Sequence, residues 1–189
     1  MITSELIEFG ENLVFDLQQP INCIPYGLLW GMVLLPVIFL CEKLIHRNQK
    51  PDWKRLVVWF CCIVYVYVML NTAFFNREPG SRTRVDLQLF GTWTNELPRN
   101  RFMFENIIMF LPFGILFPCV ILPLRKVWWC VLAGCLCSTG IELIQLFTQR
   151  GFCQLDDVVA NTAGAFLGWV ICRVFLLRWS SKIIKRSLT

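Results

Sequence analysis

The sequence predicts an all-α protein, a polytopic transmembrane helical bundle of about five spans with a structured outer loop. Its charge content points to a membrane protein, because 16% of the 189 residues are charged and 56% are hydrophobic. A soluble domain carries about 25% charged residues. The apolar residues also gather in five runs, each of roughly 20 residues, the length that a helix needs to cross about 30 Å of hydrocarbon.

The predicted spans cover more than half of the chain and leave no room for a separate soluble domain. In chain order they are residues 22–41, 56–75, 106–124, 127–147 and 158–177. The third contains Pro112, Pro118 and Pro123, and each proline removes a backbone donor and can kink a helix. Pro112 and Gly114 are expected either to open a cleft below the outer surface or only to adjust helix packing.

Residues 1–21 precede the first span and carry four acidic residues but no Lys or Arg. This is the wrong charge for the start of a secretory signal peptide, so no cleavage is expected. Apolar residues such as Leu6, Leu13 and Leu17 recur at roughly helical spacing. The pattern predicts an amphipathic helix on the outer membrane surface, with a loosely ordered tail as the alternative.

The basic residues predict which side of the membrane each end occupies. Three segments, 42–55, 125–126 and 178–189, together hold eleven basic residues, including every lysine, against six on the opposite side. Cytoplasmic loops are enriched in Lys and Arg. We therefore expect a multi-pass protein of the bacterial plasma membrane, with its N-terminus outside and a basic cytoplasmic tail over 178–189.

The predicted outer loop, residues 76–104, is the only connection long enough to have structure of its own. Val85, Leu87 and Leu89 alternate with polar residues, which is typical of a short strand. Long loops without regular structure are usually functional or disordered. The apolar alternation favours a loop that packs onto the helices as a cap.

Two polar helix faces are expected where the fourth and fifth spans meet on the outer side. Residues spaced four, three and four positions apart share one face of a helix. The face on the fourth span consists of Ser138, Glu142, Gln145 and Gln149. The face on the fifth span consists of Asp157, Asn161, Gly164 and Gly168. The two glycines predict a close approach of a neighbouring helix backbone.

Asn106, at the start of the third span, and Arg150, on the connecting turn, lie at the same expected depth. Any one of these polar residues has a structural explanation: Gln145 can hydrogen-bond a neighbouring helix, and Asp156 can cap the fifth span. For the whole set we favour a ligand site. Its predicted ligand-binding residues are Asn106, Gln145, Arg150, Asn161 and Arg77.

The acids of this site outnumber its base. Glu142, Asp156 and Asp157 are candidates for catalysis, and Arg150 alone opposes their charge. Unpaired buried charge is unfavourable. The excess predicts a bound cation, a carboxyl group that stays protonated, or a loop arginine nearby. The candidate loop arginines are Arg77, Arg99 and Arg101.

The chemistry open to an enzyme with this site is narrow. The only histidine, His46, is expected on the opposite membrane face, which excludes Ser-His and Cys-His nucleophile pairs and histidine-based zinc sites. Catalysis would depend on carboxylates, and Mg²⁺ or Mn²⁺ would suit their oxygens. No cofactor follows with certainty, and a divalent cation is the candidate.

Several segments together resemble the VanZ-like family. They are Asn106 with "FLPFG" at 110–114, "STGIELIQLF" at 138–147, Arg150, and "LDDVVANTAGAFLG" at 155–168. "NTAFFNR" at 71–77 and "RVDLQLF" at 84–90 are weaker matches. In the latter, Leu89 stands where the family often has a proline, so the turn there is expected to differ.

The resemblance implies a small bacterial membrane protein linked to resistance to glycopeptide antibiotics, above all teicoplanin. It implies no particular reaction, so whether the chain is an enzyme stays open. The expected function is to lower susceptibility to teicoplanin-type antibiotics at the outer leaflet. The alternative is a carboxylate-based membrane enzyme acting on a lipid-linked or cell-wall substrate. The expected partners are the lipid bilayer and a lipoglycopeptide or lipid-linked wall precursor, and no nucleic acid.

Overall fold

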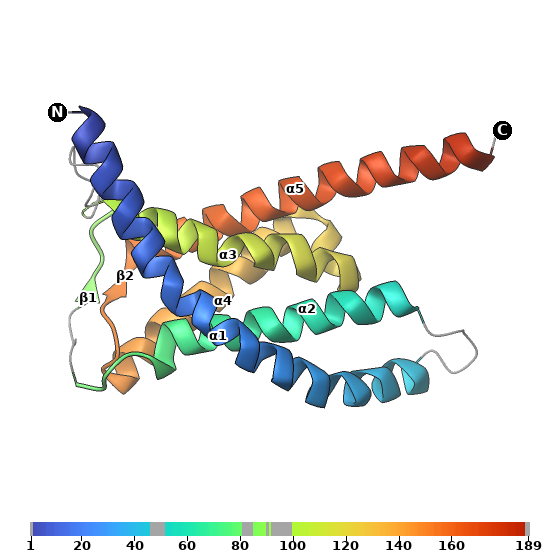
Figure 1. Ribbon diagram of the computed structural model, residues 1–189, viewed down its shortest axis with the longest axis horizontal. Helices are drawn as coiled ribbons and strands as arrows, with labels where there is room; N and C mark the ends of the chain where they lie inside the picture. Colours follow the sequence, from blue (N-terminus) through green and yellow to red (C-terminus); the bar gives the residue numbers. More distant parts are fainter. Residues whose placement is uncertain (1, 46–51, 81–84, 90, 92–99, 188–189) are drawn as a thin grey trace.

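The computed structural model describes residues 2–45, 52–80, 85–89, 91 and 100–187. Within them the chain forms a bundle of long helices (Figure 1), which confirms the predicted all-α class. The helices are α1 (Ile2–Ile45), α2 (Trp53–Leu70), α3 (Arg101–Val120), α4 (Val127–Thr148) and α5 (Leu155–Ser187). Shorter elements are the π-helix η1 (Asn71–Phe75), the 3₁₀ helix η3 (Leu122–Arg125), and the strands β1 (Val85–Asp86) and β2 (Cys153–Gln154).

Among the described residues, five helical segments are long and apolar enough to cross a membrane. They are Leu6–Ile45, Trp53–Phe75, Arg101–Val120, Val127–Thr148 and Leu155–Val174. A helix satisfies its own backbone polar groups, as hydrocarbon requires. Large apolar side chains such as Trp128 and Phe147 are more than four-fifths exposed, which suits a surface that faces lipid.

Helix α1 has no break at the expected boundary between residues 1–21 and 22–41. It runs unbroken through Pro20, Pro25 and Pro36, so the loosely ordered tail is not what the structure shows. At about 1.5 Å per residue its 44 residues extend roughly 66 Å, more than a bilayer's total thickness of about 40–45 Å. That the first 21 residues lie on the membrane stays a prediction.

The third predicted span ended too late. Helix α3 stops at Val120, because Ile121 is extended, and Pro123 lies in η3 rather than inside the span. Pro112 and Pro118 do lie inside α3. The predicted fifth span, 158–177, began three residues after the first residue of α5, and the helix extends well beyond the bundle toward the C-terminus (Figure 1).

Helices α3 and α5 pack with their backbones in contact, as the glycines predicted. A Cβ on Gly164 or Gly168 would collide with the backbone of α3, and one on Gly114 would collide with the backbone of α5. Small residues permit such approach between membrane helices. Gly114 therefore serves packing rather than a cleft, and it aligns α3, which carries Asn106, with α5, which carries Asp157.

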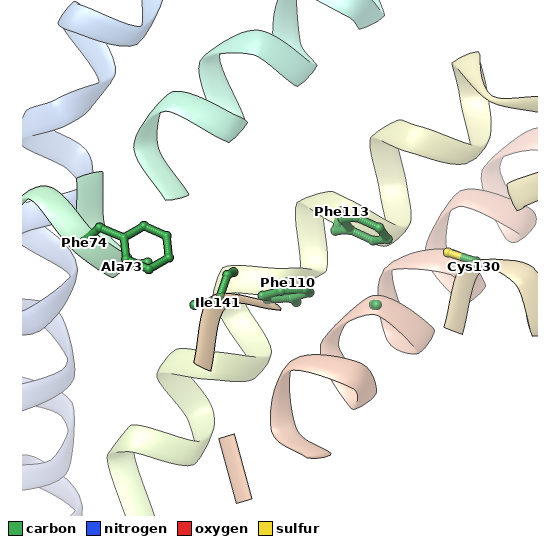
Figure 2. Packing of buried hydrophobic residues seen from close by; sticks show 7 residues of the cluster. Ala73, Phe74, Phe110, Phe113, Cys130 and Ile141 are labelled. Carbon is green, nitrogen blue, oxygen red and sulfur yellow. The ribbon is translucent and has the colours of Figure 1, made fainter. Parts of the chain in front are cut away.

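The buried apolar core lies between η1, α3, α4 and α5. Figure 2 shows it extending from Ala73 and Phe74, past Phe110 and Ile141, to Phe113 and Cys130. The Phe110 and Phe113 rings stand 5.8 Å apart, centroid to centroid. This core holds the end of α2 against α4, at the level where the polar residues gather.

The loop expected at residues 76–104 meets the turn between α4 and α5 through a two-stranded parallel ladder. Val85 pairs with Cys153 and Asp86 with Gln154, so the strand expected near Val85 is present but short. The Gly80 amide also donates to the Gln149 carbonyl at 3.0 Å. These contacts place the described part of the loop over the turn (Figure 1). The predicted loop also includes residues 81–84, 90 and 92–99, among them Arg99, which lie outside the described residues. His46 and the last two residues of the predicted tail lie outside them as well.

Candidate functional site

A π-helical turn at the end of α2 supplies two backbone acceptors to the site. In η1 the Asn76 amide donates to the Asn71 carbonyl, five residues back, at 3.0 Å. The Gln145 Nε2 donates to the Ala73 carbonyl at 3.1 Å, and the Arg150 Nη1 donates to the Phe74 carbonyl at 2.7 Å. Such turns occur frequently at functional sites. Here the turn anchors the C-terminal end of α4.

The end of α4 removes Gln149 from the expected polar face. The helix stops at Thr148, and Gln149 adopts a left-handed conformation with φ of 56°. The Arg150 amide then donates to the Gln145 carbonyl at 2.9 Å. Ser138, Glu142 and Gln145 are buried as expected, whereas Gln149 is exposed. The predicted polar face included Gln149, one helical turn beyond Gln145. This part of the prediction was wrong, because the chain leaves the helix before Gln149.

Glu142 connects α4 to the strand pair. Its side chain is 3% exposed, and Oε2 accepts a hydrogen bond from the Gln154 amide at 3.0 Å. A charge-assisted bond of this kind is stronger than a neutral one. The charges of Asp157 and Arg77 also act on Glu142. The buried carboxyl group therefore both positions β2 and faces the other charged residues of the site.

Arg77 is the cation at the centre of the cluster. A Cβ on Gly151 would meet Gln145 Oε1 at 2.8 Å and Arg77 Nη1 at 3.0 Å, so the absence of a side chain there lets the two residues approach. The charge of Arg77 acts on Glu142 and on Asp157. Of the three loop arginines expected near the acids, the structure therefore places Arg77 beside them.

Asp157 joins α5 to α3. The Asn106 side chain donates a hydrogen bond to the Asp157 carboxyl group, as their shared depth suggested. Asp156 and Asp157 both lie in the first turn of α5, where the positive end of the helix dipole favours acids. Asp156 does not precede the helix as a cap, because α5 already begins at Leu155.

Asn161 lies between α4 and α5. Its Nδ2 donates to Ser138 Oγ at 2.8 Å, and both side chains are at most 1% exposed. The bond joins the two helices below the cluster. Asn161 Oδ1 has no hydrogen-bond partner among the described residues. The observed contact of Asn161 is thus structural, and its role in ligand binding stays a prediction.

A cavity of about 210 Å³ extends the site between α1, α2 and α3. Arg77 and Asn106 line it together with Asp16 and Glu105, two acids that the sequence did not identify as site residues. Arg101, expected as a partner for the acids of α4 and α5, instead pairs with Asp16, Nε to Oδ2, at 3.3 Å. Asp16 was missed because residues 1–21 were interpreted as separate from the spans. Glu105 was missed because it fell just before the predicted third span, although it adjoins Asn106.

Metal binding and thiol chemistry gain no support from this geometry. Among the described residues, no three His, Cys, Asp or Glu side chains form a set that would hold a metal ion. Cys153 adjoins the cluster, but burial and the nearby Glu142 charge raise the pKa of its thiol. An activated cysteine needs the opposite environment. The cluster can instead bind polar groups through a guanidinium, two amides and carboxyl groups.

The chain matches the family model described as VanZ/LLP1 over residues 55–177, about two thirds of its length. No curated protein and no solved structure among those compared with the chain matches it. The matched range contains α3, α4, both strands and most of α2 and of α5. It also contains every residue of the cluster around Arg77, which are Arg77, Asn106, Glu142, Gln145 and Asp157. With the membrane-spanning helices and the motifs at 138–168, this match shows that the chain belongs to the VanZ/LLP1 family.

Proposed function

We propose that the chain acts at the outer leaflet of the bacterial plasma membrane and lowers susceptibility to teicoplanin-type glycopeptide antibiotics. The observation that carries the proposal is the cluster of Arg77, Asn106, Glu142, Gln145 and Asp157. It lies at the end of the bundle where α1 begins and the strands pair (Figure 1). The excess of basic residues in the opposite connections favours the exterior for this end.

The cluster suits recognition of a polar group on a membrane-anchored ligand. Arg77 presents a planar guanidinium, which binds oxygen-rich groups well. Gln145 has Nε2 bound to the Ala73 carbonyl, while its Oε1 lies near Gly151 and Arg77. A lipoglycopeptide and a lipid-linked wall precursor both carry amides and hydroxyls above an apolar anchor. Either would reach this depth from the outer leaflet.

The direct experiment is expression in a susceptible Gram-positive host, with inhibitory concentrations measured for teicoplanin and vancomycin. Protection from teicoplanin is expected, with less effect on vancomycin, which has no lipid chain. Arg77→Ala should remove protection, because the central cation of the cluster is lost. Arg173→Ala is the matched control, since Arg173 is exposed on α5 outside the cluster. Unchanged inhibitory concentrations for both drugs would refute the resistance role.

The second candidate is a carboxylate-based membrane enzyme acting on a lipid-linked or cell-wall substrate. Its support is that the charge of Arg77 acts on both Glu142 and Asp157, so one cation lies near two acids. Such a pair can transfer protons when a substrate lies within hydrogen-bond reach. Comparing extracted lipids and wall fragments from cells with wild-type protein and with Asp157→Asn tests it. Identical profiles would leave binding without catalysis.

A further inference from the structure

Two cysteine side chains meet between α3 and α5, away from the cluster around Arg77. Cys119 lies one residue before the end of α3, and its Sγ is 3.6 Å from the Sγ of Cys172 on α5. From Asn106 to Cys119 the chain advances about 20 Å along α3. The thiol pair is therefore a second chemical feature of the bundle, at the other end of α3 from the polar cluster.

The packing of the two helices permits a covalent bond between the sulfurs. About one turn earlier on each helix, a Cβ on Gly168 would lie 3.0 Å from the Gly114 Cα, so the two backbones are in contact. The Cα atoms of disulfide-linked cysteines lie about 4.4–6.8 Å apart, a range that helices reach when they pack this closely. An S–S bond of about 2.05 Å requires the sulfurs to approach by about 1.5 Å. Small rotations about the side-chain bonds of both cysteines would cover this distance.

The present contacts of the two thiols oppose such a bond little. Both cysteines are free thiols in the structure. The Cys119 thiol donates to the Ile115 carbonyl oxygen at 3.3 Å, and its sulfur also contacts that of Cys172. A thiol is a weak hydrogen-bond donor and a weak acceptor. Breaking these contacts therefore costs less than breaking an ordinary backbone hydrogen bond.

The two sulfurs differ in how easily a reagent reaches them. Cys119 is partly exposed, whereas Cys172 is 4% exposed. Both lie close to the ends of their membrane-spanning segments, Arg101–Val120 and Leu155–Val174, so a small uncharged oxidant can reach Cys119 there. The charge of Arg125, in the connection after α3, acts on both thiols. Basic residues are typical neighbours of reactive cysteines. This arrangement favours Cys119 as the sulfur that reacts first.

The predicted orientation places this pair at the cytoplasmic end of the bundle, beside the basic connection at 125–126. Thiols stay reduced in the cytosol, where the disulfides that do form are usually transient and catalytic or redox-sensing. Two free thiols in contact match the reduced state of such a pair. A transient rise in an oxidant would convert it to the linked state.

We propose that Cys119 and Cys172 are a hydroperoxide-sensitive thiol pair that forms a reversible disulfide between α3 and α5. The Cys119 thiolate attacks one oxygen of hydrogen peroxide, breaks the O–O bond and becomes a sulfenic acid, while the leaving hydroxide takes up the proton of the thiol to form water. The Cys172 sulfur then attacks the Cys119 sulfur, forms the S–S bond and releases a second water. The two thiols lose two electrons and two protons, which reduce one peroxide to two waters. The reaction would occur whether or not the chain lowers susceptibility to an antibiotic.

The test treats the reduced full-length protein in phosphatidylcholine nanodiscs with hydrogen peroxide, alkylates the remaining thiols and maps the peptides by mass spectrometry without reduction. The expected product is a peptide pair linked through Cys119 and Cys172, two hydrogen atoms lighter than the separate peptides, which a reductant separates. Oxidation should also raise the unfolding temperature, because a cross-link between distant residues restricts the unfolded chain. An unreacted pair, linkage of other cysteines in its place, or only sulfinic and sulfonic products at Cys119 would overturn the proposal.

Single variants separate the roles of the two sulfurs. In Cys172→Ala the reaction should stop at the Cys119 sulfenic acid, which dimedone captures, and oxidation should no longer raise the unfolding temperature. In Cys119→Ala the remaining thiol should stay reduced, because Cys172 is 4% exposed. Cys41→Ala changes an exposed cysteine of α1 and should form the linked peptide as the wild type does. Dimedone capture at Cys172 in Cys119→Ala, or loss of the linked peptide in Cys41→Ala, would refute the assignment. The wild-type peptide map decides the pairing even if a variant does not fold.

Discussion

Replacing Glu142 by glutamine separates the charge of this residue from its structural role. The glutamine Oε1 can still accept the hydrogen bond that the Gln154 amide donates at 3.0 Å. A bond to a charged group contributes about 1.5–3 kcal/mol and a neutral one about 1 kcal/mol. Glu142→Gln should therefore lower the free energy of unfolding by about 0.5–2 kcal/mol. Glu142→Ala removes the bond entirely and should lower the free energy of unfolding by about 1.5–3 kcal/mol.

The functional effect of the same change should be much larger than its effect on stability. Glu142 is 3% exposed and its charge faces Arg77. Glutamine would place a neutral amide, with added donors, beside the guanidinium. If the proposed function is right, Glu142→Gln should reduce teicoplanin protection to the level of cells without the protein. Inhibitory concentrations are compared at equal expression, and thermal unfolding in detergent reports the fold.

Glu11→Gln is the control, because it makes the same change at an exposed position of α1. It should leave both protection and thermal unfolding unchanged. A second substitution, Arg77→Lys, keeps the positive charge but removes the planar fork. Full protection in both Glu142→Gln and Arg77→Lys would mean that the cluster only holds the fold, and the site assignment would be wrong.

Other regions make equally specific predictions. Arg150→Lys should lower the free energy of unfolding by about 1 kcal/mol and keep antibiotic protection, because the observed contact of Arg150 is with the Phe74 carbonyl. Lost protection at equal expression would show that the Arg150 guanidinium acts on a ligand. Gly168→Ala should destabilise the protein by about 1–3 kcal/mol through overpacking against α3, whereas Gly140→Ala, which meets nothing within 4 Å, should not lower the unfolding temperature. If the C-terminus is cytoplasmic as predicted, a fluorescent protein fused after Thr189 should fluoresce in a bacterial host, and alkaline phosphatase fused at the same point should stay inactive. The reverse result would contradict the predicted orientation.

The α4 and α5 faces show what local spacing can predict. Glu142 and Gln145 share a buried face, and Gly164 and Gly168 permit close packing, because positions three or four residues apart align in any regular helix. The same rule failed at Gln149, where the helix had already ended. Spacing predicts which residues share a face. It does not predict whether a residue just beyond the last turn, such as Gln149, still lies on that face.

The sequence by itself determined that the chain is a membrane-spanning helical bundle, because apolar length and helical spacing are local properties that the bilayer requires of each segment separately. It also determined which acids share a helix face. Only the tertiary structure decided that the π-turn at Asn71–Phe75 anchors α4, that Arg77 is the central cation, and that Asp16 and Glu105 meet across a cavity. These contacts join residues far apart in the chain, and they depend on how the helices are rotated and packed against one another, which no single segment specifies.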